Sequence, residues 1–125
     1  MNMLLAVAVG GGAGSLARYW LAGWVQPANA AFPYGIFVVN ILGGLLMGMV
    51  VELGALKLSL SPEMRAFLTT GILGGFTTFS TFSLDSALLL QKGEYALAAA
   101  YVTGSVVLSI AALFAGLWMI RTLLA

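Results

Sequence analysis

Four long apolar segments, separated by short polar turns, limit the possible folds of this chain more than any other feature of its sequence. A helix needs roughly 20 apolar residues to cross the ~30 Å hydrocarbon core of a bilayer, and each segment reaches that length. We therefore predict an all-α integral membrane protein, with all 125 residues in a single four-span domain. The predicted spans cover about residues 4–25, 34–56, 63–91 and 95–123.

Helix-breaking residues mark the turns between these segments. Pro27 and Pro33 interrupt the first turn, and Gly93 lies in the last. Ser61 followed by Pro62 is typical of a helix start, with serine as the N-cap and proline at the first helical position. No basic residue precedes the first apolar run, which also continues past the length of a signal-peptide core. We expect that run to be retained as the first transmembrane helix.

The composition places the chain in a lipid bilayer and excludes several classes of function. Hydrophobic residues make up 62% of the chain and charged residues only 7%, whereas soluble domains carry about 25% charged residues. The chain contains no cysteine and no histidine, so thiol chemistry is excluded and the hydroxyl groups have no imidazole base to activate them. We therefore do not expect an enzyme. The net charge is only +1 and no basic run is present, so the sequence does not predict a nucleic-acid partner.

The five basic residues are divided almost evenly between the two sides of the predicted membrane domain. Lys57, Arg65 and Arg121 lie on one side, whereas Lys92 and the inner charge Arg18 lie on or nearer the other. Since the positive-inside rule gives so little bias, the chain could insert in both orientations and pair antiparallel with itself. The alternative is that loop length or a partner fixes one orientation. Glycine-rich faces in the first two segments indicate close helix packing, either within one subunit or in an oligomer.

The stretch from Gly71 to Ser83 is the part of the chain least suited to a continuous helix. Glycines, hydroxyl groups and phenyl rings alternate there, and each glycine costs roughly 1 kcal/mol relative to alanine in a helix. A backbone break inside a bilayer is tolerated only where it is packed in protein or faces water or an ion. We predict a break near residues 74–78 and place the functional centre in this stretch.

Polar side chains at membrane depth are costly, and they are therefore candidates for function. Arg18 could line a vestibule that attracts anions, or its charge could reach the interface by snorkelling. The Asn40 amide could donate to an anion or bind a neighbouring helix. Asp85 could move protons, but its position near the following turn favours an ion pair with Lys92.

Two rows of polar and aromatic residues face one another in the predicted third and fourth segments. Tyr101, Ser105 and Ser109 are spaced by four and therefore share one face of a helix. Phe79 and Phe82 also share a face, and the positive edges of their rings could favour an anion weakly. Packing of the rings as core, and hydroxyl bonds to the helix backbone, are the structural alternatives. The hydroxyl row of the third segment comprises Thr77, Thr78, Ser80, Thr81 and Ser83.

Taken together, three blocks of this sequence resemble the Fluc fluoride channels, also called the CrcB family. The blocks are the glycine-rich first segment ending in Arg18 and Tyr19, residues 35–43 around Asn40, and residues 71–83. The resemblance implies a fluoride-selective channel that exports fluoride passively across the bacterial inner membrane. It also implies a dual-topology antiparallel homodimer with two separate fluoride pathways.

The resemblance also implies roles for individual residues. A structural Na⁺ at the dimer interface would be held by the backbone carbonyls of Gly74 and Thr77 from both subunits. Two departures from the family pattern, Ile36 and Leu113, stand where other members carry threonine. The residues expected along the fluoride pathway are Arg18, Asn40, Phe79, Thr81, Phe82, Tyr101, Ser105 and Ser109.

Two other functions fit a small four-span protein. A dual-topology multidrug exporter would need a membrane-buried glutamate in the first helix, and the first segment here contains no acidic residue. A non-transporting membrane scaffold could be assembled on the glycine-rich faces. Fluoride transport separates the channel from both alternatives.

Overall fold

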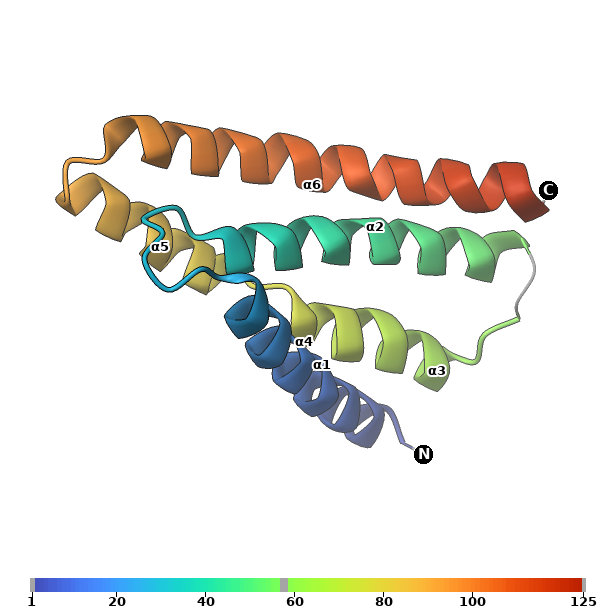
Figure 1. Ribbon diagram of the computed structural model, residues 1–125. Coiled ribbons are helices and arrows are strands. Elements are labelled where there is room, and N and C mark those ends of the chain that lie inside the picture. Colours follow the sequence, from blue (N-terminus) through green and yellow to red (C-terminus); the bar gives the residue numbers. More distant parts are fainter. Residues whose placement is uncertain (1, 57–58, 125) are drawn as a thin grey trace.

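The computed structural model is helical throughout the part of the chain that it describes, residues 2–56 and 59–124 (Figure 1). No strand occurs among these residues, and Lys57, one of the five basic residues compared above, lies outside them. The elements are α1 (Met3–Val25), α2 (Tyr34–Leu56), α3 (Pro62–Ala66), the π-helix η1 (Phe67–Leu73), α4 (Gly74–Phe76), α5 (Phe79–Gln91) and α6 (Tyr95–Leu124).

Three of the described helices, α1, α2 and α6, are long and apolar enough to cross a membrane. The protein is therefore an all-α membrane protein. The predicted third segment is divided among four shorter elements, α3, η1, α4 and α5. The predicted start of this segment is confirmed, because Ser61 caps α3 by accepting a hydrogen bond from the Met64 N–H at 3.1 Å and Pro62 follows it.

The helices form two packed groups (Figure 1). In one group α2 and α6 run side by side, and in the other α1 crosses η1 and α4. Glycines allow both approaches: a Cβ on Gly44 would lie 2.5 Å from the Ser109 carbonyl oxygen, and one on Gly14 would overlap the Ile72 carbonyl. These glycines therefore pack within the subunit. Gly12 differs, because its face of α1 has open space.

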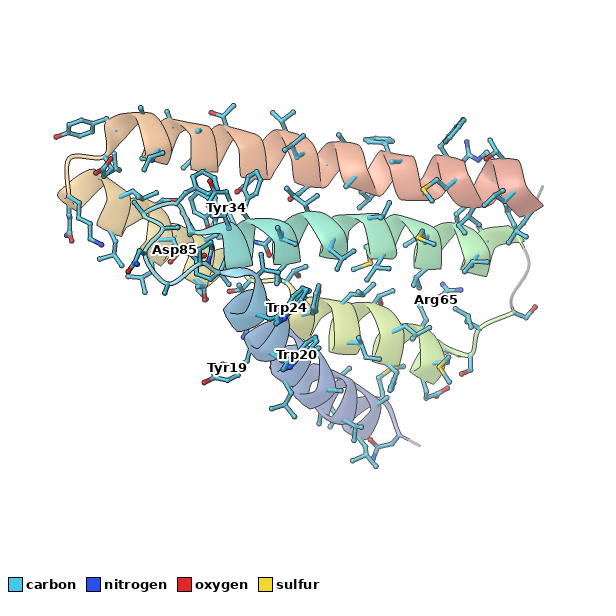
Figure 2. The ribbon with its side chains drawn as sticks, viewed as in Figure 1. Tyr19, Trp20, Trp24, Tyr34, Arg65 and Asp85 are labelled. Carbon is cyan, nitrogen blue, oxygen red and sulfur yellow. The ribbon has the colours of Figure 1, made fainter. Side chains whose placement is uncertain are left out.

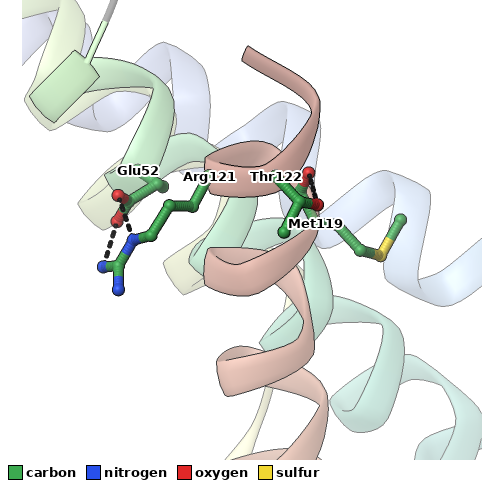
Figure 3. Close-up of polar contacts among 4 residues, drawn as sticks. All are labelled: Glu52, Met119, Arg121 and Thr122. Atoms are coloured by element: carbon green, nitrogen blue, oxygen red, sulfur yellow. Dashed lines mark hydrogen bonds and ion pairs between the residues drawn. The ribbon is translucent and has the colours of Figure 1, made fainter. Parts of the chain in front are cut away.

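An ion pair joins the ends of α2 and α6 (Figure 3). Arg121 donates from Nε to Glu52 Oε1 at 3.0 Å and from an Nη to Oε2 at 3.3 Å. Glu52 is only 6% exposed, so burying its charged carboxylate would cost free energy without this partner. Within residues 2–56 and 59–124 this is the one ion pair, and it holds the two long helices in register at this end.

α1 carries three exposed aromatic side chains (Figure 2). Trp20 and Trp24 lie on one side of the helix and Tyr19 projects from another. The two indole rings are stacked, with centroids 6.2 Å apart. Tryptophan is enriched where a membrane protein meets the bilayer interface, so the side of α1 that carries Trp20 and Trp24 suits contact with lipid.

Candidate functional site

The helical path of the third segment is interrupted by two extended residues. Thr77 has φ −87° and ψ 158°, and Thr78 has φ −151° and ψ 126°. Gly74 to Phe76 remain helical, so the glycines do not themselves interrupt the helix. The helix restarts at Phe79 because the Thr78 hydroxyl accepts the Thr81 N–H at 3.2 Å and serves as an N-cap.

The side chain of Asn40, on α2, holds this extended step in place. Its Nδ2 donates to the Thr78 carbonyl at 3.1 Å, and its Oδ1 accepts the Thr78 N–H at 2.9 Å. The paired bonds resemble those between two strands, and they satisfy backbone groups that no helix serves. One N–H of the Asn40 amide remains after these two bonds. Asn40 therefore binds a neighbouring segment and keeps a single donor for another ligand.

The step also removes the helical partners of the last four carbonyls before it, those of residues 74–77. Two of them are the carbonyls of Gly74 and Thr77: in a continuous helix the Thr78 N–H would bond to the first, and the Thr81 N–H to the second. Both N–H groups are instead bonded to side-chain oxygens. The Thr77 carbonyl accepts a bond from Arg18 Nη1 at 3.3 Å, so the charge of Arg18 lies beside the step.

A cation at this step would have to use such carbonyl oxygens. Across the described residues there is no group of three or more His, Cys, Asp or Glu side chains that could hold a metal ion. The Gly74 and Thr77 carbonyls, released from helical bonding, are hard and neutral ligands of the kind that alkali and alkaline-earth ions accept. They fit an alkali ion, with the Thr77 carbonyl shared with Arg18.

The hydroxyl row on α6 faces a pocket of about 430 Å³. The Oγ atoms of Ser105 and Ser109 are buried and have no hydrogen-bond partner within the described part of the chain. A buried hydroxyl without a partner is costly, so two on one helix face point to a ligand that they serve. Five of the predicted pathway residues line this pocket: Asn40, Phe79, Phe82, Ser105 and Ser109.

Phe79 and Phe82 lie on the same side of α5 but have different surroundings. Their ring centroids are 5.5 Å apart. Phe79 is 77% exposed, whereas Phe82 is 8% exposed and packs against the Tyr101 ring at 5.1 Å. Phe82 is thus part of the core as well as of the pocket wall, and Phe79 is the ring that a ligand or a second chain can reach.

Tyr101 contacts one lining residue of each of two pockets, Phe82 of the first and Asp85 of a second. Its side chain is fully buried, and its hydroxyl donates to Asp85 Oδ2 at 3.0 Å. The expected ion pair between Asp85 and Lys92 is therefore wrong: the Tyr101 hydroxyl, across the α5–α6 contact, is the partner of the carboxylate. Asp85 lines a pocket of about 600 Å³ together with Arg18 and Thr81.

Sequence reasoning missed the contacts that cross between segments. The bond from Arg18 to Thr77 joins residues 59 apart in the chain, and no local pattern predicts it. Glu52 and Arg121 could have been paired in advance, as opposite charges in two spans that end on the same side. The loop residue Gln26 also received no role, although it lines the second pocket.

These features define a class of protein. An all-helical membrane protein with two unpartnered buried hydroxyls, and with an interrupted helix that lines two pockets, has the properties of a channel or a transporter. The family model described as "CrcB-like protein, Camphor Resistance (CrcB)" matches residues 5–117. The chain belongs to the CrcB family.

Similar proteins extend over the full length of this chain. A relative in Rhodospirillum centenum is 50% identical over 129 residues and covers 100% of each chain. One in Agrobacterium fabrum is 52% identical, covering 98% of this chain and 99% of the relative. A third, in Caulobacter vibrioides, is 49% identical and covers 100% of each chain. All three are named fluoride-specific ion channel FluC.

Proposed function

We propose that this chain forms a fluoride-selective channel, through which fluoride leaves the cell passively across the bacterial inner membrane. The names of its full-length relatives support this function. The structural observation that carries it is the pair of buried, unpartnered hydroxyls of Ser105 and Ser109, which face the same pocket as Phe79.

Fluoride suits this pocket because of its hydration. The ion is small and strongly hydrated, so a pathway must replace its water molecules with hydrogen-bond donors. The Ser105 and Ser109 hydroxyls can rotate to donate, and Asn40 retains one free N–H. The ring edges of Phe79 and Phe82 add a weak attraction that lets the ion leave again. Conduction needs this balance between entry and release.

The second pocket would provide the entry on one side. Arg18 lies there and carries a charge that attracts anions, and Thr81 offers a further hydroxyl. Tyr101 contacts a wall residue of each pocket, with its ring on Phe82 and its hydroxyl on Asp85. In this proposal Tyr101 supports both walls from the buried side.

In this proposal α3, η1, α4 and α5 together form the third of four membrane spans, broken at Thr77 and Thr78. Two copies of the chain would assemble as a dual-topology antiparallel homodimer with two pathways. The even division of basic residues supports insertion in both orientations. The exposed ring of Phe79 also supports a dimer, because a second copy would cover it and close the open side of the pocket.

A structural Na⁺ shared by the two subunits would be held by the Gly74 and Thr77 carbonyls of each. When bound, it would supply the positive charge that holds these oxygens together at the dimer axis. The support for this site is the loss of helical partners at both carbonyls. Arg18 would help to orient the Thr77 carbonyl.

Fluoride efflux from liposomes tests the channel function. Vesicles containing the purified dimer are loaded with fluoride or with chloride, and release is followed with ion-selective electrodes. We expect rapid fluoride release and no chloride release. Phe79→Ile and Phe82→Ile should each block fluoride release while the protein still elutes as a dimer. Absence of fluoride release from folded, dimeric wild-type protein would refute the proposal.

A further inference from the structure

The loop between α1 and α2, residues 26–33, is tied down by one glutamine side chain. Gln26 Nε2 donates to the Phe32 carbonyl at 3.0 Å, and the Gly35 N–H donates to Gln26 Oε1 at 2.9 Å. The Gly35 N–H is one of the first-turn donors of α2 that have no partner within the helix. Gln26 thus fixes the loop to the start of α2 and sets the position of Phe32.

Phe32 extends from this loop into the aromatic cluster beside the pathway. Its ring meets the Tyr101 ring edge-on, with centroids 5.5 Å apart and planes at 88°. It also meets Phe37 edge-on at 5.2 Å. Because Phe82 covers another side of Tyr101 at 5.1 Å, the tyrosine ring is enclosed by residues from a loop, α2 and α5. Phe32 is the loop's contribution to that enclosure.

The orientation of the Tyr101 ring matters because its hydroxyl reaches Asp85. A hydroxyl at the end of a rigid ring moves when the ring moves, so the 3.0 Å bond depends on the contacts that surround the ring. Gln26 itself lines the second pocket, as do Arg18 and Asp85. The loop therefore contributes a wall to the second pocket, and it supports Tyr101, which contacts a wall residue of each pocket.

We propose that the α1–α2 loop is a positioning element of the pathway. Gln26 holds Phe32 against Tyr101, and Phe32 keeps the Tyr101 hydroxyl on Asp85 and the Tyr101 ring on Phe82, which fixes one wall residue of each pocket. Phe32 lies outside both pockets and acts through Tyr101, whereas Gln26 also lines the second pocket. This inference rests on the proposed channel function, since it assigns the loop a role in conduction.

Single-channel recording in planar bilayers separates positioning from general stability, because the unitary current reports only on channels that have folded. The variants are Phe32→Leu and Gln26→Met, in which the new side chains are uncharged and close in size to those they replace. Phe114→Leu is the matched control, since Phe114 is 64% exposed on α6 and outside both pockets. We expect the unitary fluoride current to fall about threefold or more in the two loop variants, the effect of losing an edge-on aromatic contact. The control should match wild type.

The dependence on Tyr101 is tested by repeating Phe32→Leu in a Tyr101→Phe background. If Phe32 acts through the tyrosine hydroxyl, adding Phe32→Leu to the Tyr101→Phe channel should leave its current unchanged. Unitary currents equal to wild type in both loop variants would overturn the inference. It would also be overturned if the current of the double variant fell by the product of the two fold-changes that Phe32→Leu and Tyr101→Phe cause singly. No fluoride current in the wild type would instead overturn the channel function on which the inference rests.

Discussion

Replacing Asn40 with leucine tests whether one side chain holds the interrupted helix in shape. Leucine has a similar size but can form neither of the bonds that Asn40 makes with the Thr78 backbone. The Thr78 N–H and carbonyl would then both lose their partners in a half-buried site. Each such orphaned group costs about 1–3 kcal/mol. Leucine recovers a few tenths of a kcal/mol in helix propensity, about 0.4 at most. The free energy of unfolding should therefore fall by about 1.6–5.6 kcal/mol, the cost of the two orphaned groups less this gain.

Two measurements check this value. Denaturant titration in detergent micelles, followed by far-ultraviolet circular dichroism, gives the free energy of unfolding. Amide hydrogen exchange at Thr78 reports the local effect, and its protection should fall roughly 15- to 10,000-fold, the same free energy expressed as a ratio. Asn29→Leu is the matched control, because Asn29 is exposed in the α1–α2 loop. An Asn40→Leu protein within about 0.5 kcal/mol of wild type, with Thr78 still protected, would refute the reasoning.

Two further predictions concern the pocket and the packing of α1. The Ser105 and Ser109 hydroxyls have no hydrogen-bond partner, so replacing both residues with alanine should leave the melting temperature unchanged or raise it. The same double substitution should lower fluoride efflux. A clear fall in the melting temperature would mean that the hydroxyls are hydrogen-bonded. Gly14→Ala places a Cβ on the Ile72 carbonyl and should destabilise the protein by about 1–3 kcal/mol. Gly12→Ala meets open space within α1 and should stabilise the protein by up to about 1 kcal/mol. Equal unfolding free energies for the two glycine variants would contradict this packing.

The long helices could be predicted from the sequence because an uninterrupted apolar run sets their length. The predicted ranges 34–56 and 95–123 correspond to α2 (Tyr34–Leu56) and α6 (Tyr95–Leu124). The third segment was harder, because glycine propensity is a weak local preference that tertiary contacts override. Gly74 stays helical, and the extended residues are those that Asn40 and Arg18 contact from α2 and α1. A pattern within one segment does not contain that information.

The candidate site shows the same limit. Spacing alone placed Phe79 and Phe82 on one face, but it could not tell that one is exposed and the other buried, because a neighbouring helix decides burial. Likewise, closeness in sequence suggested Lys92 as the partner of Asp85, whereas contact between α5 and α6 provides Tyr101. The polar residues could be named as candidate functional residues from the sequence, because polar side chains are costly in a membrane. Their hydrogen-bond partners could be identified only from the three-dimensional fold.

Fluoride current through single channels tests the central claim most directly. Purified wild-type protein and Phe79→Ile are recorded in planar bilayers, first with fluoride on both sides and then with chloride in its place. We predict that the wild-type current is carried by fluoride, disappears in chloride, and is abolished by the Phe79→Ile substitution. A current of similar size in chloride, or an undiminished fluoride current in Phe79→Ile, would contradict a fluoride pathway beside the exposed ring of Phe79.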